Sequence, residues 1–204
     1  MSAPTDLRIS RLRVPTPAER TPEVARFFEA TERREGHIPN WLSAFSLGQD
    51  HFQRLNRYLF PLLEGSADAP GRLTLREREI LATIVSVDNG CAYCHTLHVD
   101  GLGKVLDDHW LAHRVALDHR EVEELSEREH LLADLALVLT RTPGEVSDDR
   151  IEALREVDLS DEDIFEAVQI VSIINATNRI TLALGVLPDR QIFADHGGHH
   201  DGDR

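Results

Sequence analysis

The sequence predicts an all-α fold, because signals that start and stop helices recur along the chain while strand patterns are nearly absent. Thr74-Leu-Arg-Glu77 and Ser126-Glu-Arg-Glu129 both fit the capping box, in which a hydroxyl caps a helix and a Glu three residues later reaches back. The long segment after Ser160 keeps its apolar residues at roughly helical spacing. We therefore expect about eight helices packed into one compact multi-helix domain.

Turn-forming residues separate these helices. An amphipathic run from about Trp41 to Leu63, preceded by Pro39-Asn40, predicts one helix. The helix that begins at Thr74 should end at Asn89-Gly90, because Gly adopts the left-handed conformation that closes a helix. The next helix should begin at or near Cys91. Further breaks are expected at residues 65–71 and at Thr142-Pro143-Gly144.

A short internal repeat suggests a duplicated helical element. Val85-Ser-Val-Asp-Asn89 aligns with Val171-Ser-Ile-Ile-Asn175, although two amphipathic helices can resemble each other by chance. The second copy has Thr177 and Ile180 in place of Cys91 and Cys94. The polar residues of that copy, which we expect to hydrogen-bond in the core or at a subunit interface, are Asn175, Asn178 and Arg179.

Length and composition fit a single globular domain. The chain has 204 residues, of which 41% are hydrophobic and 28% charged, and this ordinary usage argues against wholesale disorder. Three prolines among the first twenty residues predict an N-terminal arm over residues 1–19, followed by one all-helical domain over residues 20–193. The sequence HGGHHDGDR predicts a disordered His-rich tail over residues 194–204.

Charge and hydropathy bear on the partners and the compartment. The formal net charge is −14, from 36 acidic against 22 basic residues, and Lys and Arg do not cluster, so we do not expect a nucleic-acid partner. No apolar run approaches the ~18 residues of a membrane-spanning helix, and the N-terminus lacks the apolar stretch of a secretory signal. We expect a cytoplasmic protein with no membrane partner, in which a C-x-x-C pair is catalytic or metal-binding rather than structural.

The segment NGCAYCHTLHVDG, residues 89–101, holds both cysteines of the chain. On a helix that turns 100° per residue, Cys91, Cys94, His95 and His98 fall at about 0°, −60°, +40° and −20°, so all four share one face. Free N–H groups in the first turn favour an anion and lower a thiol pKa. Each cysteine has a histidine four residues further on, the spacing at which helical side chains touch.

Glu79 favours His98 over His95 as the base. If the helices on either side of Asn89-Gly90 fold back on each other, residues about equally far from the turn come abreast, which brings Glu79 near His98. A carboxylate there would orient the imidazole and complete a set of nucleophile, base and orienter. The hypothesis depends on the hairpin.

Other chemistries also match the cysteine segment. C-A-Y-C-H fits the haem-attachment pattern, but covalent haem is typical of exported proteins and the only methionine is Met1. Zinc could bind Cys91, Cys94 and a histidine such as His109 or His113, yet no second cysteine pair exists. Two inert buried thiols are the simplest alternative. We expect neither a metal nor an organic cofactor.

The spacing E-x11-C-x2-C-x3-H, formed by Glu79, Cys91, Cys94 and His98, resembles the alkyl hydroperoxidase D-like group of the carboxymuconolactone decarboxylase superfamily. The stretches LTLREREILATIVSVDNGCAYCHTLH and DEDIFEAVQIVSIINATNRITLALGVLPD resemble its peroxidase-related branch, so that the likeness covers most of residues 20–190. The resemblance implies an all-helical fold with duplicated elements and a homo-oligomer, commonly a trimer or hexamer.

The resemblance also implies roles for single residues. The second cysteine of the family motif attacks the peroxide and the first resolves it, which here makes Cys94 peroxidatic and Cys91 resolving, with Glu79 and His98 as a proton relay. The best-known members have a histidine between the cysteines where this chain has Tyr93, which implies a shorter relay or weaker activity. Decarboxylase members lack the dithiol, so the cysteine pair favours redox chemistry.

We therefore predict an enzyme, a thiol-dependent alkyl hydroperoxide reductase. Cys94 thiolate attacks a hydroperoxide, and the sulfenic acid condenses with Cys91 to a disulfide. By resemblance, a lipoylated or thioredoxin-like protein is the dithiol reductant. The alternatives are a dithiol redox sensor or disulfide reductase, and a carboxymuconolactone decarboxylase-like enzyme without peroxidase turnover.

Overall fold

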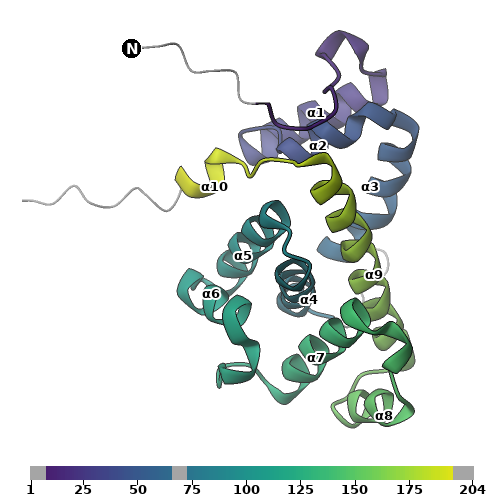
Figure 1. The fold of residues 1–204 in the computed structure, drawn as a ribbon, viewed down its shortest axis with the longest axis vertical. Helices are drawn as coiled ribbons and strands as arrows, with labels where there is room; N and C mark the ends of the chain where they lie inside the picture. Colours follow the sequence, from purple (N-terminus) through teal and green to yellow (C-terminus); the bar gives the residue numbers. More distant parts are fainter. Residues whose placement is uncertain (1–7, 66–72, 195–204) are drawn as a thin grey trace, which may run out of the picture.

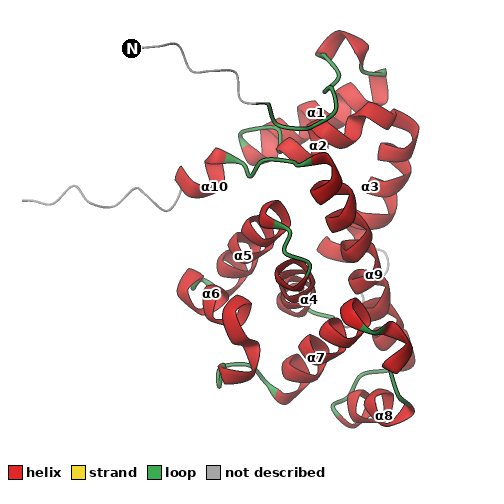
Figure 2. Cartoon of the chain, viewed as in Figure 1, coloured by secondary structure: helices red, strands yellow, loops and turns green. Residues whose placement is uncertain are grey.

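The computed structural model describes residues 8–65 and 73–194, and within these ranges every regular element is a helix (Figure 1, Figure 2). The predicted all-α fold is confirmed. The α-helices are α1 (Pro22–Glu35), α2 (Asn40–Phe45), α3 (Gln49–Glu64), α4 (Leu75–Asp88), α5 (Ala92–Leu106), α6 (His109–Asp118), α7 (Glu127–Arg141), α8 (Asp148–Glu156), α9 (Asp161–Leu184) and α10 (Arg190–Ala194).

The single helix predicted from about Trp41 to Leu63 is wrong. The chain forms α2, a short 3-10 turn over Ser46–Gly48, and then α3. Gly48 has φ −105° and ψ 74°, outside the helical region, and the Ser46 hydroxyl donates to the carbonyl of Ser43 at 2.8 Å. A local side-chain hydrogen bond and a glycine interrupt a run whose apolar spacing is otherwise helical.

The capping boxes expected from the sequence are present. Thr74 caps α4, where the Thr74 N–H donates to the Glu77 carboxylate at 2.7 Å and the Glu77 N–H donates to the Thr74 hydroxyl at 3.2 Å. Ser126 and Ser160 cap α7 and α9 in the same manner. Each box satisfies two N–H groups that would otherwise lack partners at a helix start.

Helix α4 is the centre of the domain. It packs against α3, α5, α6, α7 and α9, and Figure 1 shows these helices arranged around it. The side chains of Ile80, Leu81, Ala82 and Val85 are fully buried in the main core cluster. A helix that is apolar on nearly all sides belongs inside a domain. Because α4 lies at the centre, both of its ends pack against neighbouring helices.

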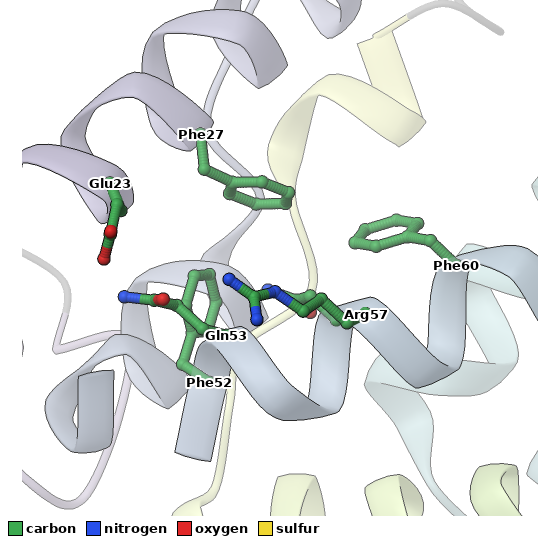
Figure 3. A pocket seen from close by; sticks show the side chains of 7 residues that line it. Glu23, Phe27, Phe52, Gln53, Arg57 and Phe60 are labelled. Atoms are coloured by element: carbon green, nitrogen blue, oxygen red, sulfur yellow. The ribbon is translucent and has the colours of Figure 1, made fainter. Parts of the chain in front are cut away.

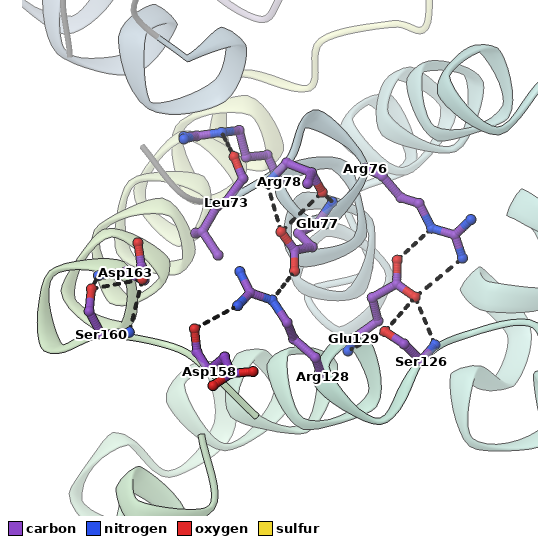
Figure 4. A network of polar contacts seen from close by, with 11 residues as sticks. Leu73, Arg76, Glu77, Arg78, Ser126, Arg128, Glu129, Asp158, Ser160 and Asp163 are labelled. Atoms are coloured by element: carbon purple, nitrogen blue, oxygen red, sulfur yellow. Dashed lines mark hydrogen bonds and ion pairs between the residues drawn. The ribbon is translucent and has the colours of Figure 1, made fainter. Parts of the chain in front are cut away.

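At its N-terminal end, α4 meets α7 through a reciprocal pair of ion pairs (Figure 4). Arg76 of α4 binds Glu129, the capping-box Glu of α7, and Arg128 of α7 binds Glu77, the capping-box Glu of α4. Both glutamates are buried. Each carboxylate therefore caps its own helix and also fixes the neighbouring one.

The two halves of the suspected repeat lie side by side. Helices α4 and α9 are in contact, and Asn89 Nδ2 donates to Asn175 Oδ1 at 3.0 Å. These two asparagines are equivalent positions of the repeat. The duplication itself stays a prediction.

Helix α9 is, among the described residues, the one helix long and apolar enough to cross a membrane by length and composition alone. A core helix of a soluble protein passes the same test, and α9 contributes Ile164, Ile170, Val171 and Ile174 to the core.

The N-terminal helices form a separate aromatic cluster with a hollow of about 250 Å³ between α1 and α3. Its walls include Phe27, Phe52 and Phe60, with Glu23 and Arg57 beside them (Figure 3). No cysteine or histidine is among the described residues that line this hollow.

Part of the expected N-terminal arm packs onto the C-terminal segment. Arg11 N–H donates to the carbonyl of Leu184 at 2.6 Å, and Leu187 N–H donates to the carbonyl of Ile9 at 3.2 Å. The predicted tail, residues 194–204, lies outside the described residues apart from the backbone of Ala194. The division into arm, domain and tail stays a prediction.

Candidate active site

The two cysteines lie at the turn between α4 and α5, as expected. Helix α4 ends at Asp88, Gly90 takes a left-handed φ of +63°, and Cys91 is the N-cap of α5. The structure holds Cys91 and Cys94 as a disulfide with Cα atoms 5.3 Å apart, inside the range of ~4.4–6.8 Å that native disulfides use. The local backbone therefore suits the oxidised pair.

The start of α5 also suits a thiolate. The Cys91 sulfur accepts the N–H of Cys94 at 3.3 Å, in the position that a Ser or Asp takes at other helix starts. Cys94 lies in the first turn, where the N–H groups and the helix dipole favour negative charge. In the reduced protein both effects would favour a thiolate.

Glu79 and His98 meet, as the hairpin hypothesis requires. His98 Nδ1 lies 3.1 Å from Glu79 Oε2, and both side chains are largely buried. Because a carboxylate only accepts hydrogen bonds, Nδ1 is the donor, and Nε2 of the neutral ring is left as the acceptor. Gly101 makes room for this carboxylate, since a Cβ there would lie 3.0 Å from Glu79 Oε2.

His95 has a different environment. It lines a hollow between α5 and α6 together with His109 and His113. Burial and, secondarily, the charge of His113 lower the pKa of His95. Among the described residues Glu79 binds His98 and no hydrogen bond joins it to His95, so geometry separates the two histidines that sequence spacing leaves equivalent.

Cys94 opens onto a cavity between α3, α5 and α9. Apolar walls come from Trp41, Leu97 and Ile174, and His98 lines the same cavity. Cys91 is not among the described lining residues, and its exposed fraction is 1% against 5% for Cys94. A small substrate in this cavity would reach Cys94 first.

A wider groove of about 290 Å³ lies on the other side of His98. Glu79, Arg34, Lys104 and His37 are among its lining residues, and it shares Trp41, Leu63, Leu97 and His98 with the cavity of Cys94. His98 thus borders both the cavity and the groove, while its partner Glu79 lines the groove alone.

Three buried polar residues near this pair are absent from the sequence prediction of the site. Thr83 and Ser86 follow Glu79 at helical spacing along α4, and Asn178 of α9 lines the Cys94 cavity. Asn178 Nδ2 donates to Ser86 Oγ at 3.3 Å, while Thr83 Oγ1 and Asn178 Oδ1 have no hydrogen-bond partner among the described residues. Polar positions at i, i+4 and i+7 in an apolar helix were the available signal.

The carboxymuconolactone decarboxylase family model matches residues 49–105, which include Glu79, both cysteines and His98. The crystal structure of an alkylhydroperoxidase AhpD core, an uncharacterized peroxidase-related protein from Ralstonia eutropha JMP134, is 26% identical, with a TM-score of 0.86 over 92% of this chain and 96% of that one. The chain is an AhpD-like member of the carboxymuconolactone decarboxylase superfamily.

Two further solved structures resemble the AhpD-like protein. An uncharacterized peroxidase-related protein from Silicibacter sp. TM1040 is 26% identical, with a TM-score of 0.82 over 94% of this chain and 97% of that chain. The debrominase Bmp8 is 16% identical, with a TM-score of 0.74 over 91% and 94% of the two chains, and shows a shared fold. No curated protein sequence matches the chain significantly.

Tyr93, between the cysteines of the AhpD-like protein, is bound by a residue remote in sequence. Its hydroxyl donates to Asp189 Oδ2 at 2.6 Å, and Asp189 Oδ1 accepts the N–H of Asn40 at the start of α2. Burial, with the negative charge of Asp189 second, raises the pKa of Tyr93 well above 10.0. Tyr93 thus joins the dithiol turn to the C-terminal segment and to α2.

The other polar residues of α9 have structural hydrogen bonds. Asn175 Nδ2 donates to Thr140 Oγ1 at 3.0 Å, and Arg179 donates to Asn175 Oδ1 at 2.7 Å. The expectation of hydrogen bonds within the fold is confirmed for this pair.

The zinc alternative finds no support in the geometry. Within residues 8–65 and 73–194, no group of three or more His, Cys, Asp or Glu side chains is arranged to hold a metal ion. His109 and His113 lie with His95 rather than in the Cys94 cavity.

Proposed function

We propose that this AhpD-like protein reduces organic hydroperoxides, with Cys94 as the attacking thiol. One observation supports this most directly: Cys94 and His98 line one cavity, and His98 Nδ1 is held by Glu79. Cys94 is then the nucleophile, His98 its base and Glu79 the group that orients the base, which is the arrangement that activates a weak nucleophile.

The reaction runs in two balanced steps. His98 Nε2 takes the Cys94 proton, the thiolate attacks the terminal oxygen, the O–O bond breaks, and the alkoxide leaves as an alcohol with the proton from His98. Cys94 is now a sulfenic acid. The Cys91 thiol then attacks the Cys94 sulfur, which forms the disulfide and releases water.

A dithiol donor must reduce the disulfide before another cycle. A lipoylated or thioredoxin-like protein is the donor we propose, and a reducing cytoplasm is the matching compartment. We also propose a homo-oligomer, a trimer or hexamer.

The test is the thiol count of reduced, metal-free protein before and after one equivalent of cumene hydroperoxide. We expect the parent to lose two thiols, and Cys91→Ser to give a sulfenic acid that dimedone traps at Cys94. Cys94→Ser should lose peroxide-dependent oxidation and is the matched control, because the chain has only two cysteines. Full peroxide turnover by Cys94→Ser, or two untouched thiols in the parent, would disprove the proposal.

A dithiol redox sensor is the second candidate, favoured by the burial of both sulfur atoms. A protein reductant needs access to a disulfide sulfur, so a buried disulfide persists once formed. Slow turnover with a long-lived disulfide, measured by mass spectrometry after peroxide removal, would favour the sensor. Rapid reduction by a lipoylated or thioredoxin-like protein would favour the peroxidase.

A further inference from the structure

Asn178 has hydrogen-bonding capacity that the fold does not use. Its side chain has an exposed fraction of 0%, and it lines the cavity that contains Cys94 and His98. Only its Nδ2 is bonded, to Ser86 Oγ, and Oδ1 has no partner among the described residues. A buried polar group without a partner destabilises a fold, so such a group calls for an explanation.

The unused capacity does not depend on which way the amide is turned. The Ser86 hydroxyl both donates and accepts, so it pairs with either end of the Asn178 amide. In the orientation observed, the carbonyl oxygen has no hydrogen-bond partner among the described residues. In the reverse orientation, the NH2 group would have none. Asn178 therefore has one end bound to α4 and one end without a partner among the described residues, on a residue that lines the cavity.

We propose that Asn178 binds the peroxide group of the substrate and that the cavity selects neutral organic hydroperoxides with a compact apolar group. This inference rests on the proposed peroxidase function. The hydroperoxide O–H donates to Asn178 Oδ1, which fixes the terminal oxygen, and His98 is left to protonate the departing oxygen. The S–O bond then forms as the O–O bond breaks.

The same hydrogen bond can continue through the reaction. The terminal oxygen keeps its hydrogen when it is transferred to Cys94, so the sulfenic acid O–H remains within reach of the Asn178 carbonyl. This contact would hold the sulfenic acid until Cys91 attacks the Cys94 sulfur.

The cavity is small, about 50 Å³, so it takes the peroxide group and only the nearest part of the organic group, and its walls determine what that part can be. Trp41, Leu59, Leu97 and Ile174 supply apolar surface, and no Lys or Arg is among the described residues that line it. A carboxylate close to the peroxide group would lie in this cavity without a cationic partner and would lose hydration. We therefore expect cumene hydroperoxide to react faster than an analogue that carries a carboxylate close to its peroxide group.

The experiment uses the Cys91→Ser protein, in which Cys94 is the sole thiol. The rate of Cys94 oxidation by cumene hydroperoxide is divided by the rate of its alkylation by iodoacetamide. Alkylation reports the amount and accessibility of thiolate, so the ratio isolates peroxide recognition. We expect Asn178→Leu to lower this ratio by about tenfold to 100-fold. The serine side chain in Asn178→Ser is too short to reach both Ser86 and the substrate, so this variant should lower the ratio as well. It replaces Asn178→Leu in the test if the leucine variant does not fold.

The matched control is Asn175→Ala, on the same helix, which removes an amide already bonded to Thr140 and Asn89. It should lower Tm and leave the ratio within about twofold. A parent that peroxide does not oxidise would refute the proposed function and this inference together. A reactive parent with unchanged ratios in both Asn178 variants would refute the inference alone, as would equal falls in oxidation and alkylation.

Discussion

Helix α4 carries two buried polar clusters that differ in how completely their groups are paired. At its N-terminal end, Arg76 and Glu77 exchange ion pairs with Glu129 and Arg128 of α7, and each glutamate also caps its own helix (Figure 4). Along the face toward the dithiol, only Glu79 has a charged or ring partner. Thr83 and Asn178, which lies across from Ser86, keep polar atoms with no partner among the described residues.

This difference in pairing implies that one cluster stabilises the fold and the other takes part in the reaction. A fully paired buried network fixes how two helices meet, and removing one member leaves another buried charge unpaired. Unpaired buried atoms do not help a fold, and they are found where a substrate or water completes the set. Substitutions in the N-terminal cluster should therefore change stability, and substitutions in the dithiol cluster should change rate.

The largest effect is expected at His98. His98→Gln keeps an amide near Glu79 but removes the base, so kcat/KM for cumene hydroperoxide should fall by about 10²- to 10⁴-fold. His95→Gln is the matched control, because His95 lines the hollow of His109 and His113, and it should stay within about twofold of the parent. Steady-state kinetics with excess reductant measure kcat/KM for the two variants and the parent. A larger loss at His95 than at His98 would reverse the assignment.

A comparable change at the other end of α4 should act on folding instead. Glu77→Ala removes the buried carboxylate that pairs with the half-buried Arg128 and removes half of a capping box, so the free energy of unfolding should fall by about 3 kcal/mol. Denaturant titration measures this loss, and kcat/KM of the folded variant should change by less than about twofold.

The double variant Glu77→Ala/Arg128→Ala sharpens the comparison. Removing both partners leaves no unpaired charge at this contact, so its stability loss should be smaller than the sum of the two single losses. Additive losses would show that the two side chains act independently. A rate effect as large as that of His98→Gln would remove the distinction between the clusters.

Local signals in the sequence predicted the parts of the site that lie within one hairpin. The turn at Asn89-Gly90, the helix start at Cys91 and the meeting of Glu79 with His98 all follow from helix period and turn chemistry. The spacing of His95 and His98 from the two cysteines is the same, so only the neighbouring helix could separate them.

The parts that were missed depend on segments far apart in the chain. Asp189 reaches Tyr93 from beyond the end of α9, and Asn178 meets Ser86 from the second half of the suspected repeat. No local pattern gives such contacts, because they arise when helices pack. The break before α3 was missed for the opposite reason, since a single serine hydrogen bond and Gly48 outweighed a strong apolar period.

The smallest of these effects is expected at Tyr93, whose hydroxyl binds a buried carboxylate outside both clusters. Tyr93→Phe removes the hydrogen bond to Asp189, which should cost about 2 kcal/mol of the free energy of unfolding at neutral pH. The catalytic rate should change less than in His98→Gln, because the Tyr93 hydroxyl is held by Asp189 and no hydrogen bond joins it to Glu79 among the described residues.

The pH dependence of Tyr93→Phe distinguishes this hydrogen bond from simple packing. The pKa of Tyr93 is raised in the folded state above the 10.0 of a free tyrosine, so the neutral hydroxyl stabilises the fold fully below pH 10 and less as pH rises toward the folded-state pKa. The parent should lose stability above pH 10, and Tyr93→Phe should lose less. Tyr58→Phe, at the only other tyrosine, which is exposed, should retain the slope of the parent. Equal slopes in the parent and Tyr93→Phe, measured by denaturant titration from pH 8 to 11.5, would show that the Asp189 contact does not control the ionisation.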